Sequence, residues 1–168
     1  EDVKVILGEL EDSVINEIDM MVLSPGIAID APFVLRVKEA GVPIWGEIEL
    51  AYVIGKGKLA AITGTNGKTT TTALVGEIMA NYYDKVDVVG NIGNPYTTTA
   101  FDSTDDTVTV AEISSFQLET IHTFKPDVSA VLNITPDHLN RHYTMECYTD
   151  VKMSIAKNQD SNQPIVLN

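Results

Sequence analysis

Short apolar runs alternate with longer helical patterns along most of the chain. The runs are bounded by polar or glycine positions, and those at 86–89 and 107–111 are rich in β-branched residues. They predict strands at residues 3–7, 20–23, 44–45, 59–63, 86–89, 107–111, 128–134 and 165–167. Helices are predicted at residues 31–40, 47–54, 68–81, 115–122 and 144–158. Apolar strands that alternate with helices favour an α/β fold, in which helices cover both faces of a mostly parallel sheet.

Glycine and proline residues mark the ends of these elements. Pro32 lies in the first turn of the first predicted helix, and Gly41 follows the last residue of that helix. The run Gly55-Lys56-Gly57-Lys58 is typical of a flexible joint. We therefore expect a domain boundary there, with one part at residues 1–55 and the other at residues 56–168.

Composition limits the class of protein and its partners. With 168 residues, 44% of them hydrophobic, the chain is long enough for one ordinary domain, or for one domain and part of another. Eleven basic against 24 acidic residues give a net charge of −13, which argues against nucleic acid or an anionic membrane as a partner. No apolar run approaches the roughly 20 residues of a membrane span, and the single Cys147 fits a reducing cytoplasm. Composition therefore favours a cytoplasmic protein whose partners are neither nucleic acid nor a membrane.

The segment Gly64-Thr65-Asn66-Gly67-Lys68-Thr69-Thr70 carries the strongest chemical signal. It joins a predicted strand to a predicted helix, and its glycines let backbone N–H groups fold around an anion at the positive end of the helix dipole. Lys68 would place an ammonium on nucleotide phosphates, and the Thr69 hydroxyl would bind Mg²⁺. Only Thr65 and Asn66 separate the first glycine from the second, whereas the standard pattern has four residues before Gly-Lys. The segment is therefore a shortened phosphate loop, and an incidental glycine turn is the alternative.

Polar residues follow four of the predicted strands, at the edge where ligands lie in parallel sheets. They form the phosphate loop and the segments 90–95, 112–115 and 133–138. Beside a phosphate loop, Glu112 is suited to Mg²⁺, which takes hard oxygen ligands; a carboxylate favoured at a helix start is the alternative. His138 could bind a metal or transfer a proton, although a lone histidine is more often structural. That structural explanation applies more strongly to His122 and His142.

Lys152 lies within the predicted 144–158 helix, where Tyr148 and Ile155 share its face at helical spacing. A lysine among apolar neighbours can have a depressed pKa, and its neutral amine can react with CO₂ to give a carbamate with oxygen ligands. From these residues alone, an exposed lysine whose stem lies along the surface is the better explanation.

Four segments together resemble the Mur ligases, the amino-acid-adding enzymes of peptidoglycan synthesis. Residues 61–70 (AITGTNGKTT) look like the ATP loop of that family, which folylpolyglutamate synthetase shares. The segments 90–95 (GNIGNP), 112–119 (EISSFQLE) and 132–142 (LNITPDHLNRH) narrow the resemblance to the branch that adds D-glutamate. The segment 112–119 is the most specific, and the resemblance covers essentially the whole chain.

The resemblance implies two incomplete domains. Ser24-Pro25-Gly26 and the segment 46–50 look like the family's first domain, so residues 1–55 would be part of a uridine-nucleotide-binding domain. Residues 56–168 would be part of the central ATP-binding domain. Because the chain does not begin with Met, we expect that the start of the first domain is missing. The resemblance also implies that the end of the second domain and the whole C-terminal domain are missing. Asn140 stands where the family usually has aspartate, which weakens the case for any charge-dependent role there.

The resemblance also implies roles in catalysis. Lys68 would neutralise charge on the ATP phosphates, and Thr69 with Glu112 would hold one Mg²⁺ ion. Glu112 and His138 would organise a second Mg²⁺ site together with Lys152. The resemblance therefore favours a carbamate on Lys152 over the exposed lysine. The whole phosphate loop would contact ATP: Gly64, Thr65, Asn66, Gly67, Lys68, Thr69 and Thr70.

On the substrate side, the resemblance assigns contacts with the nucleotide sugar to Asn91 and Ser114. It assigns contacts with the uridine diphosphate end to Ser24, Pro25 and Gly26. The implied activity is ATP-dependent amide-bond formation, in which D-glutamate is added to UDP-N-acetylmuramoyl-L-alanine through an acyl phosphate. We expect a monomer that needs ATP and Mg²⁺.

Three alternatives stay open. Another Mur ligase or a folylpolyglutamate synthetase-like ligase would use the same loop, although the Ser-Ser-Phe-Gln run at residues 114–117 disfavours both. Residues 1–168 alone could be an ATP-binding module without ligase activity. A phosphate-loop switch protein would hydrolyse nucleotide without any peptidoglycan precursor.

Overall fold

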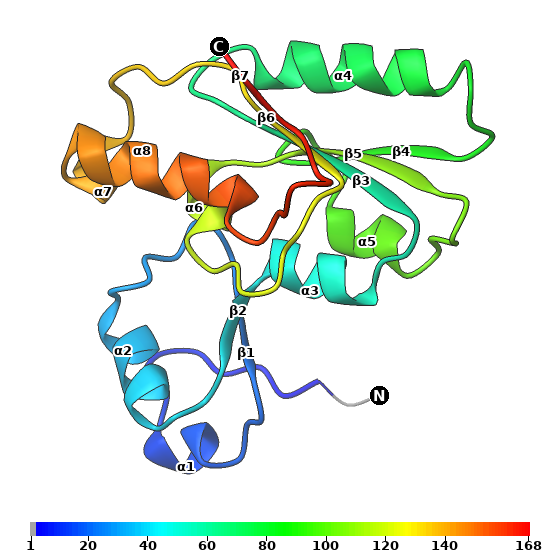
Figure 1. Cartoon of the computed structure of the whole chain (residues 1–168). Helices are drawn as coiled ribbons and strands as arrows, with labels where there is room; N and C mark the ends of the chain where they lie inside the picture. The colour runs from blue at the N-terminus through cyan, green and yellow to red at the C-terminus, as the bar shows by residue number, and fades with distance from the viewer. Residues whose placement is uncertain (1–2) are drawn as a thin grey trace.

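A five-stranded sheet is the largest element of the computed structural model, which describes residues 3–168 (Figure 1). Its strands are β3 (Lys58–Thr63), β4 (Val86–Gly90), β5 (Val108–Glu112), β6 (Val128–Val131) and β7 (Ile165–Leu167). All neighbours pair in parallel in the order β4-β5-β3-β6-β7, so β3 is central. The predicted α/β fold with a mostly parallel sheet is confirmed.

Helices cover the two faces of this sheet. One face carries α4 (Lys68–Met79), and the other carries α3 (Glu47–Ile54) and α5 (Tyr96–Ala100) (Figure 1). Alternation along β3 sends Ile62 to the core on the α4 side and Ala61 to the core on the other side. The elements that follow β5 and β6 are α6 (Ser115–Leu118), α7 (Leu139–His142), α8 (Met145–Met153) and a 3₁₀ turn (Ser154–Ala156). None of the helices in the described part of the chain could span a membrane.

The first part of the chain forms a smaller unit beside this sheet (Figure 1). Its strands β1 (Met21–Leu23) and β2 (Ile44–Gly46) pair in parallel, and α2 (Pro32–Glu39) connects them. Gly41 follows the helix with a φ of +77°, a conformation that glycine adopts without strain. The strands predicted at residues 20–23 and 44–45 and the helix predicted at residues 31–40 are confirmed.

The strand predicted at residues 3–7 is wrong, because the backbone there is irregular. Val3 and Leu7 are 83% and 92% exposed, and β1 and β2 pair only with each other among residues 3–168. An apolar run forms a strand only where a neighbour completes its backbone hydrogen bonds. Conversely, the pattern does not predict the helices α1 (Asp12–Ile15), α5 and α7, which are too short to show a helical period.

Three predicted elements are shorter than expected. The helix predicted at residues 144–158 ends at Met153 and is followed by the 3₁₀ turn. The helix predicted at residues 115–122 ends at Leu118, because the loop that follows turns its backbone N–H groups to the carboxylate of Glu49. The strand predicted at residues 128–134 ends at Val131, which is paired with the last residue of β3. Beyond that pair the chain turns into the loops that build the site.

Helix α3 packs with the large sheet although it precedes the predicted joint. Its Ile48 and Ala51 are buried in the core beneath the sheet. At the joint, the Lys56 N–H donates to the Ser103 hydroxyl at 2.8 Å, which fastens this segment to the loop before β5. The boundary after residue 55 stays a prediction, and the packing of α3 favours a division before that helix.

Glu49 ties α3 to the loop that follows α6. Its carboxylate is buried and accepts hydrogen bonds from the backbone N–H groups of His122 (2.8 Å), Thr123 (2.6 Å) and Phe124 (3.1 Å), and from the Thr123 hydroxyl (2.6 Å). Burial alone would raise the pKa of Glu49, but the hydrogen bonds from Thr123 and the backbone outweigh burial and lower the pKa. The fold therefore depends on the charged form of this side chain.

We expect Glu49→Gln to lower the free energy of unfolding at pH 7 by about 2 kcal/mol, because its amide NH₂ would face backbone donors. A carboxyl with a depressed pKa stabilises the fold above its unfolded pKa, and this contribution is lost as the pH falls through the folded pKa. The difference between wild type and variant should therefore shrink below pH 4.5, the ordinary pKa of glutamate. Urea denaturation across this range measures it, with the exposed Glu77→Gln as control. A difference that is constant with pH would contradict the prediction.

Candidate active site

The phosphate loop, residues 64–70, connects the carboxyl end of the central strand β3 to α4. Gly64 and Gly67 have φ values of +151° and +81°, where residues with a side chain are strained. A Cβ at Gly64 would lie 3.1 Å from the Leu132 Cβ and 3.3 Å from the Leu132 backbone nitrogen. The glycines therefore allow both the chain reversal and the close approach of the segment after β6.

The segment after β6 holds the phosphate loop in place. The Thr65 N–H donates to the Asn133 carbonyl at 2.9 Å. The Asn133 side chain binds both main-chain groups of Asn66: Oδ1 accepts from its N–H and Nδ2 donates to its carbonyl, each at 2.9 Å. The Thr65 hydroxyl accepts from the Thr135 N–H at 3.0 Å and lies 3.2 Å from the Tyr148 hydroxyl. Asn133 is not among the predicted site residues, and its place in the polar segment 133–138, at the end of a predicted strand, is the signal that could identify it.

These contacts decide which groups are left for a phosphate. The Asn66 N–H is bound to Asn133, whereas the first N–H groups of a helix have no partner within the helix. The start of α4 therefore offers N–H groups and the positive dipole end to an anion. The Lys68 ammonium donates to the Thr65 carbonyl at 3.0 Å, which holds the charge over the same loop.

We expect Asn133→Ala to weaken ATP binding about tenfold, because Asn66 loses both of its side-chain hydrogen bonds and the loop must be ordered by the ligand. Isothermal titration with ATP measures the change. Asn81→Ala is the matched control, since the Asn81 amide also binds a backbone carbonyl, at 2.7 Å, but at the far end of α4. Equal ATP affinities for the two variants would contradict a role for Asn133 in shaping the loop.

Glu112 brings three predicted site residues together. It is the last residue of β5, is buried, and accepts hydrogen bonds from the Thr69 hydroxyl at 2.8 Å and the Asn91 amide at 3.0 Å. Because Glu112 belongs to a strand, the explanation as a helix-start carboxylate is not needed. A hydroxyl and a carboxylate beside a phosphate loop are hard oxygen donors, so this donor set fits Mg²⁺.

Lys152 of α8 is buried beside the phosphate loop. Only 1% of the residue is exposed, and its Nζ donates to the Gly64 carbonyl at 2.8 Å and lies 4.8 Å from the centre of the Tyr148 ring. Burial, and then the positive charge of Lys68, lowers the pKa of Lys152 to about 8. The explanation as an exposed lysine is therefore wrong.

His138 precedes α7 with a φ of +52°. Its half-exposed ring has Nε2 3.5 Å from the Asp137 carboxylate, and its centre lies 4.9 Å from that of the Phe116 ring. Residues 3–168 hold no group of three or more His, Cys, Asp or Glu side chains that could bind a metal ion. The second Mg²⁺ site expected from Glu112, His138 and a modified Lys152 therefore stays a prediction.

The other two histidines make structural contacts. The Nε2 of His122 lies 2.8 Å from the Ile44 carbonyl, and the Nε2 of the buried His142 lies 2.9 Å from the Ser115 hydroxyl. Burial, and then the nearby charge of Arg141, lowers the pKa of His142, which favours the neutral form of this ring.

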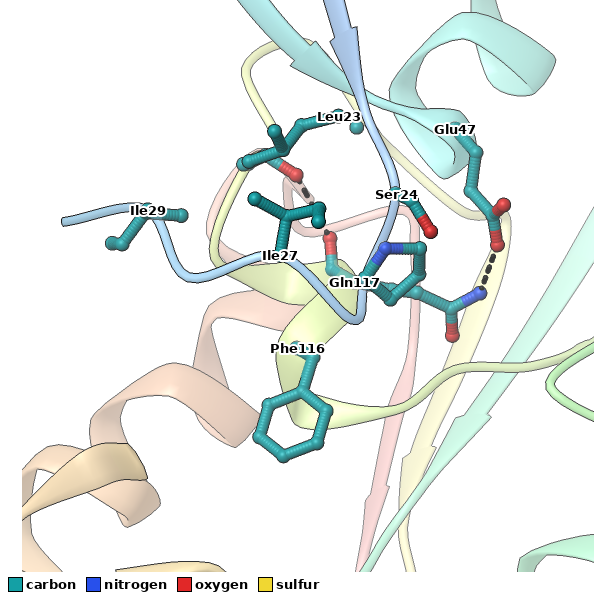
Figure 2. A pocket seen from close by; sticks show the side chains of 10 residues that line it. Leu23, Ser24, Ile27, Ile29, Glu47, Phe116 and Gln117 are labelled. Carbon is teal, nitrogen blue, oxygen red and sulfur yellow. Dashed lines mark hydrogen bonds between the residues drawn. The ribbon is translucent and has the colours of Figure 1, made fainter. Parts of the chain in front are cut away.

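Ser114, expected to contact the nucleotide sugar, caps α6. Its hydroxyl accepts from the Gln117 N–H at 3.3 Å, while the Gln117 Oε1 accepts from the Ser114 N–H at 2.8 Å. The Gln117 Nε2 also donates to the Glu47 carboxylate at 2.8 Å, as Figure 2 shows. The capping box therefore links α6 to the start of α3.

The turn at residues 24–26 lies against α6. The Ile27 N–H donates to the Ser24 carbonyl at 3.0 Å, which closes the turn. Ser24 and Pro25 line a narrow pocket together with Phe116, which in this conformation is too tight to admit a water molecule (Figure 2). The structure thus brings this turn next to α6, which begins at the residue after Ser114. Substrate contacts stay predictions for Ser24, Pro25, Gly26, Asn91 and Ser114.

The fold and the site define a class of protein: an α/β protein with a phosphate loop after its central parallel strand and a buried carboxylate beside that loop. Within this class, the chain belongs to the Mur ligase family. The model of the Mur ligase middle domain matches residues 62–168, and that of the Mur ligase MurD-like N-terminal domain matches residues 1–46.

Curated relatives named UDP-N-acetylmuramoylalanine–D-glutamate ligase are similar to nearly the whole chain. The one from Lachnospira eligens is 60% identical over 165 residues, which are 98% of this chain and 37% of the relative. The one from Clostridioides difficile is 52% identical over 168 residues, which are 99% of this chain and 37% of the relative. The chain thus spans little more than a third of these proteins.

Solved structures share the fold at lower identity. The MurF ligase from Thermotoga maritima in complex with ADP has a TM-score of 0.56 and 21% identity, over 91% of this chain and 44% of that one. MurF from Acinetobacter baumannii has a TM-score of 0.54 and 17% identity, over 72% of this chain and 28% of that one. At these identities the likeness shows the fold alone.

Proposed function

We propose that the complete protein containing this chain is an ATP-dependent ligase that joins D-glutamate to UDP-N-acetylmuramoyl-L-alanine in peptidoglycan synthesis. The observation that carries the proposal is the hydrogen-bonded set of Thr69, Glu112 and Asn91 beside the phosphate loop. It supports a nucleotide phosphate, a metal ion and a second substrate at one edge of the sheet. The activity named for the relatives at 60% identity supports the choice of amino acid and of nucleotide sugar.

The proposed reaction has two steps. A carboxylate oxygen of UDP-N-acetylmuramoyl-L-alanine attacks the γ-phosphorus of ATP, the bond to the bridging oxygen breaks, and ADP leaves. The amine of D-glutamate then attacks the carbonyl carbon of the acyl phosphate, phosphate leaves, and the nitrogen loses a proton. The first step is needed because a carboxylate is a poor electrophile and phosphorylation supplies a leaving group.

Positioning and charge neutralisation are what the residues on the ATP side supply. Lys68 and the first N–H groups of α4 would contact the phosphates. Thr69 and Glu112 would hold Mg²⁺, which supplies positive charge against the phosphate oxygens. Thr65 would affect ATP binding only indirectly, because its hydroxyl already contacts the Thr135 N–H and the Tyr148 hydroxyl, which hold the loop in place.

On the substrate side, Asn91 and Ser114 would orient the nucleotide sugar, and Ser24-Pro25-Gly26 would hold its diphosphate. Residues 1–55 would thus serve the uridine nucleotide and residues 56–168 ATP. The net charge of −13 supports small-molecule substrates in place of nucleic acid. We place the protein in the cytoplasm as a monomer.

A substrate panel tests the proposal. The complete protein is given ATP and Mg²⁺ with each pairing of a UDP-N-acetylmuramoyl precursor and an amino acid, and phosphate release is measured. We expect release only when UDP-N-acetylmuramoyl-L-alanine and D-glutamate are both present. Release with another pair would assign a different Mur ligase activity, and release without a precursor would indicate a nucleotide switch.

For residues 1–168 alone, we propose ATP binding without completed ligation. The phosphate loop and its supports lie within this chain, but the chain spans only 37% of the relative from Lachnospira eligens. Isothermal titration with ATP should show binding. Phosphate release that depends on D-glutamate, at the rate of the complete protein, would overturn this proposal.

A further inference from the structure

We propose that Arg141 is a positioning residue for the nucleotide-sugar substrate, because its guanidinium fixes the turn at residues 24–27 against α6. This inference rests on the proposed function. Arg141 lies in α7, and its Nη2 donates to the Ile27 carbonyl at 2.9 Å and to the Glu119 carboxylate at 2.5 Å. The guanidinium is rigid and planar with five N–H donors, so one group can hold both partners in a set geometry.

A hydrogen bond to the Ile27 carbonyl restrains the position of the turn that precedes it. The Ile27 N–H already donates to the Ser24 carbonyl, so the peptide groups of this turn move together. The hydrogen bond from Arg141 to the Ile27 carbonyl therefore fixes where Ser24 and Pro25 lie along the pocket that they share with Phe116 (Figure 2). The Tyr143 hydroxyl supplies a second link from the same segment, to the Asp30 carboxylate at 2.9 Å.

The ion pair between Arg141 and Glu119 holds the guanidinium in place on the α6 side. The side chains of Arg141 and Glu119 are 17% and 6% exposed, so their ion pair is shielded from water and salt. Glu119 also lies 3.5 Å from the Nδ1 of His142. The Nε2 of His142 in turn lies 2.9 Å from the Ser115 hydroxyl, next to Ser114. Arg141 is thus anchored to the start of α6, where the contacts with the nucleotide sugar are expected.

The guanidinium also covers the aromatic wall of the pocket. Its central carbon lies 5.2 Å from the centre of the Phe116 ring, and the His142 ring stacks on the same ring at 5.5 Å. The Phe116 ring is therefore in contact with both Arg141 and His142. A substitution that removes the guanidinium frees both the turn and one wall of the pocket.

The backbone of this segment is strained in a way that supports the assignment. His138 and Tyr143, on either side of α7, have φ values of +52° and +64°, which are uncommon for residues with side chains. Such strain persists only where the surroundings enforce it, and it clusters at functional sites. Here the two residues flank the short helix from which Arg141 reaches the turn.

The kinetics of the complete protein test this role. We expect Arg141→Ala to raise the KM for UDP-N-acetylmuramoyl-L-alanine about tenfold, while the KM for ATP changes less than about twofold. Arg141→Lys keeps the charge but places it on a flexible stem and removes the planar guanidinium that lies over the Phe116 ring, so its KM for the nucleotide sugar should rise about threefold. This second variant also keeps the test usable if the alanine variant does not fold. Lys125→Ala is the matched control, because Lys125 forms an ion pair with Asp160 at 2.9 Å just before β6, at the end of the sheet opposite the phosphate loop, and its loss should leave both KM values unchanged.

The outcomes separate this inference from the function on which it rests. If the wild-type protein does not use UDP-N-acetylmuramoyl-L-alanine, both are overturned. If the wild type uses it, but the Arg141 variants leave its KM unchanged or raise both KM values equally, only the role of Arg141 is overturned. A rise confined to the nucleotide sugar, graded from lysine to alanine, is the supporting result.

Discussion

Replacing Lys68 with alanine should lower the kcat of the complete protein about 10³-fold. Lys68 begins α4, and its ammonium is held over the phosphate loop by the Thr65 carbonyl at 3.0 Å. In the proposed reaction, charge shifts onto the phosphate oxygens as ADP leaves, so a fixed cation stabilises the transition state more than the bound ATP. Phosphate release at saturating substrates measures kcat, and ADP titration shows whether the nucleotide still binds.

Lys58→Ala is the matched control for this variant. Lys58 is exposed and begins the same strand, β3, at the end opposite the phosphate loop. We expect its kcat to stay within about twofold of the wild type, as for most exposed substitutions. If Lys68→Ala raised the KM for ATP and left kcat unchanged, its charge would serve binding alone, and the proposed role in transfer would be wrong.

The edge of the sheet that carries the chemistry is predictable from the sequence. Thr69, Asn91 and Glu112 are far apart in the chain, yet each follows a predicted strand, and parallel strands end at the same edge. The contacts at 2.8 and 3.0 Å confirm that these three residues meet. The rule works because it depends only on strand order along the chain and on parallel pairing, both of which hydrophobic patterns reveal.

The contacts that support this edge are not predictable in the same way. Asn133 binds Asn66 through a pair of hydrogen bonds whose geometry depends on where β6 stops, and the pattern places that end three residues too late. Arg141 reaches the Ile27 carbonyl across 114 positions, from a helix of four residues to an irregular turn, and neither is long enough to show a period. The failed strand at residues 3–7 has the same cause, because a local pattern carries no information on whether a neighbouring strand is there.

For Lys152, burial decides between an exposed, charged side chain and a buried amine with a lowered pKa. Lysine at helical spacing from apolar neighbours fits either an exposed side chain or a buried amine, and only the contact of α8 with the phosphate loop separates them. With a pKa of about 8, about a quarter of this amine is neutral at pH 7.5, against about one part in a thousand for an ordinary lysine. The neutral form is the one that attacks CO₂.

We expect Lys152→Ala to lower the activity of the complete protein about 100-fold, and added formate or acetate to restore part of it. Carbamate formation joins the lysine nitrogen to the carbon of CO₂ and releases one proton, which leaves one N–H. That N–H can still donate to the Gly64 carbonyl, now 2.8 Å from Nζ, while the two carbamate oxygens become acceptors next to the phosphate loop. A short carboxylic acid supplies the same pair of oxygens in the space that alanine opens. Initial rates with and without the acid measure the rescue.

Lys157→Ala is the control that isolates this chemistry. The Lys157 ammonium also donates to a backbone carbonyl, that of Ile121, but it lies after α8 and away from the phosphate loop. Loss of this amine should lower activity little, and no acid should restore it. If Lys152→Ala kept full activity, or lost activity that neither acid restored at any concentration, the carbamate would be wrong. Lys152 would then serve only as a hydrogen-bond donor that fixes the first residue of the loop, a role that its contact with Gly64 can fill without modification.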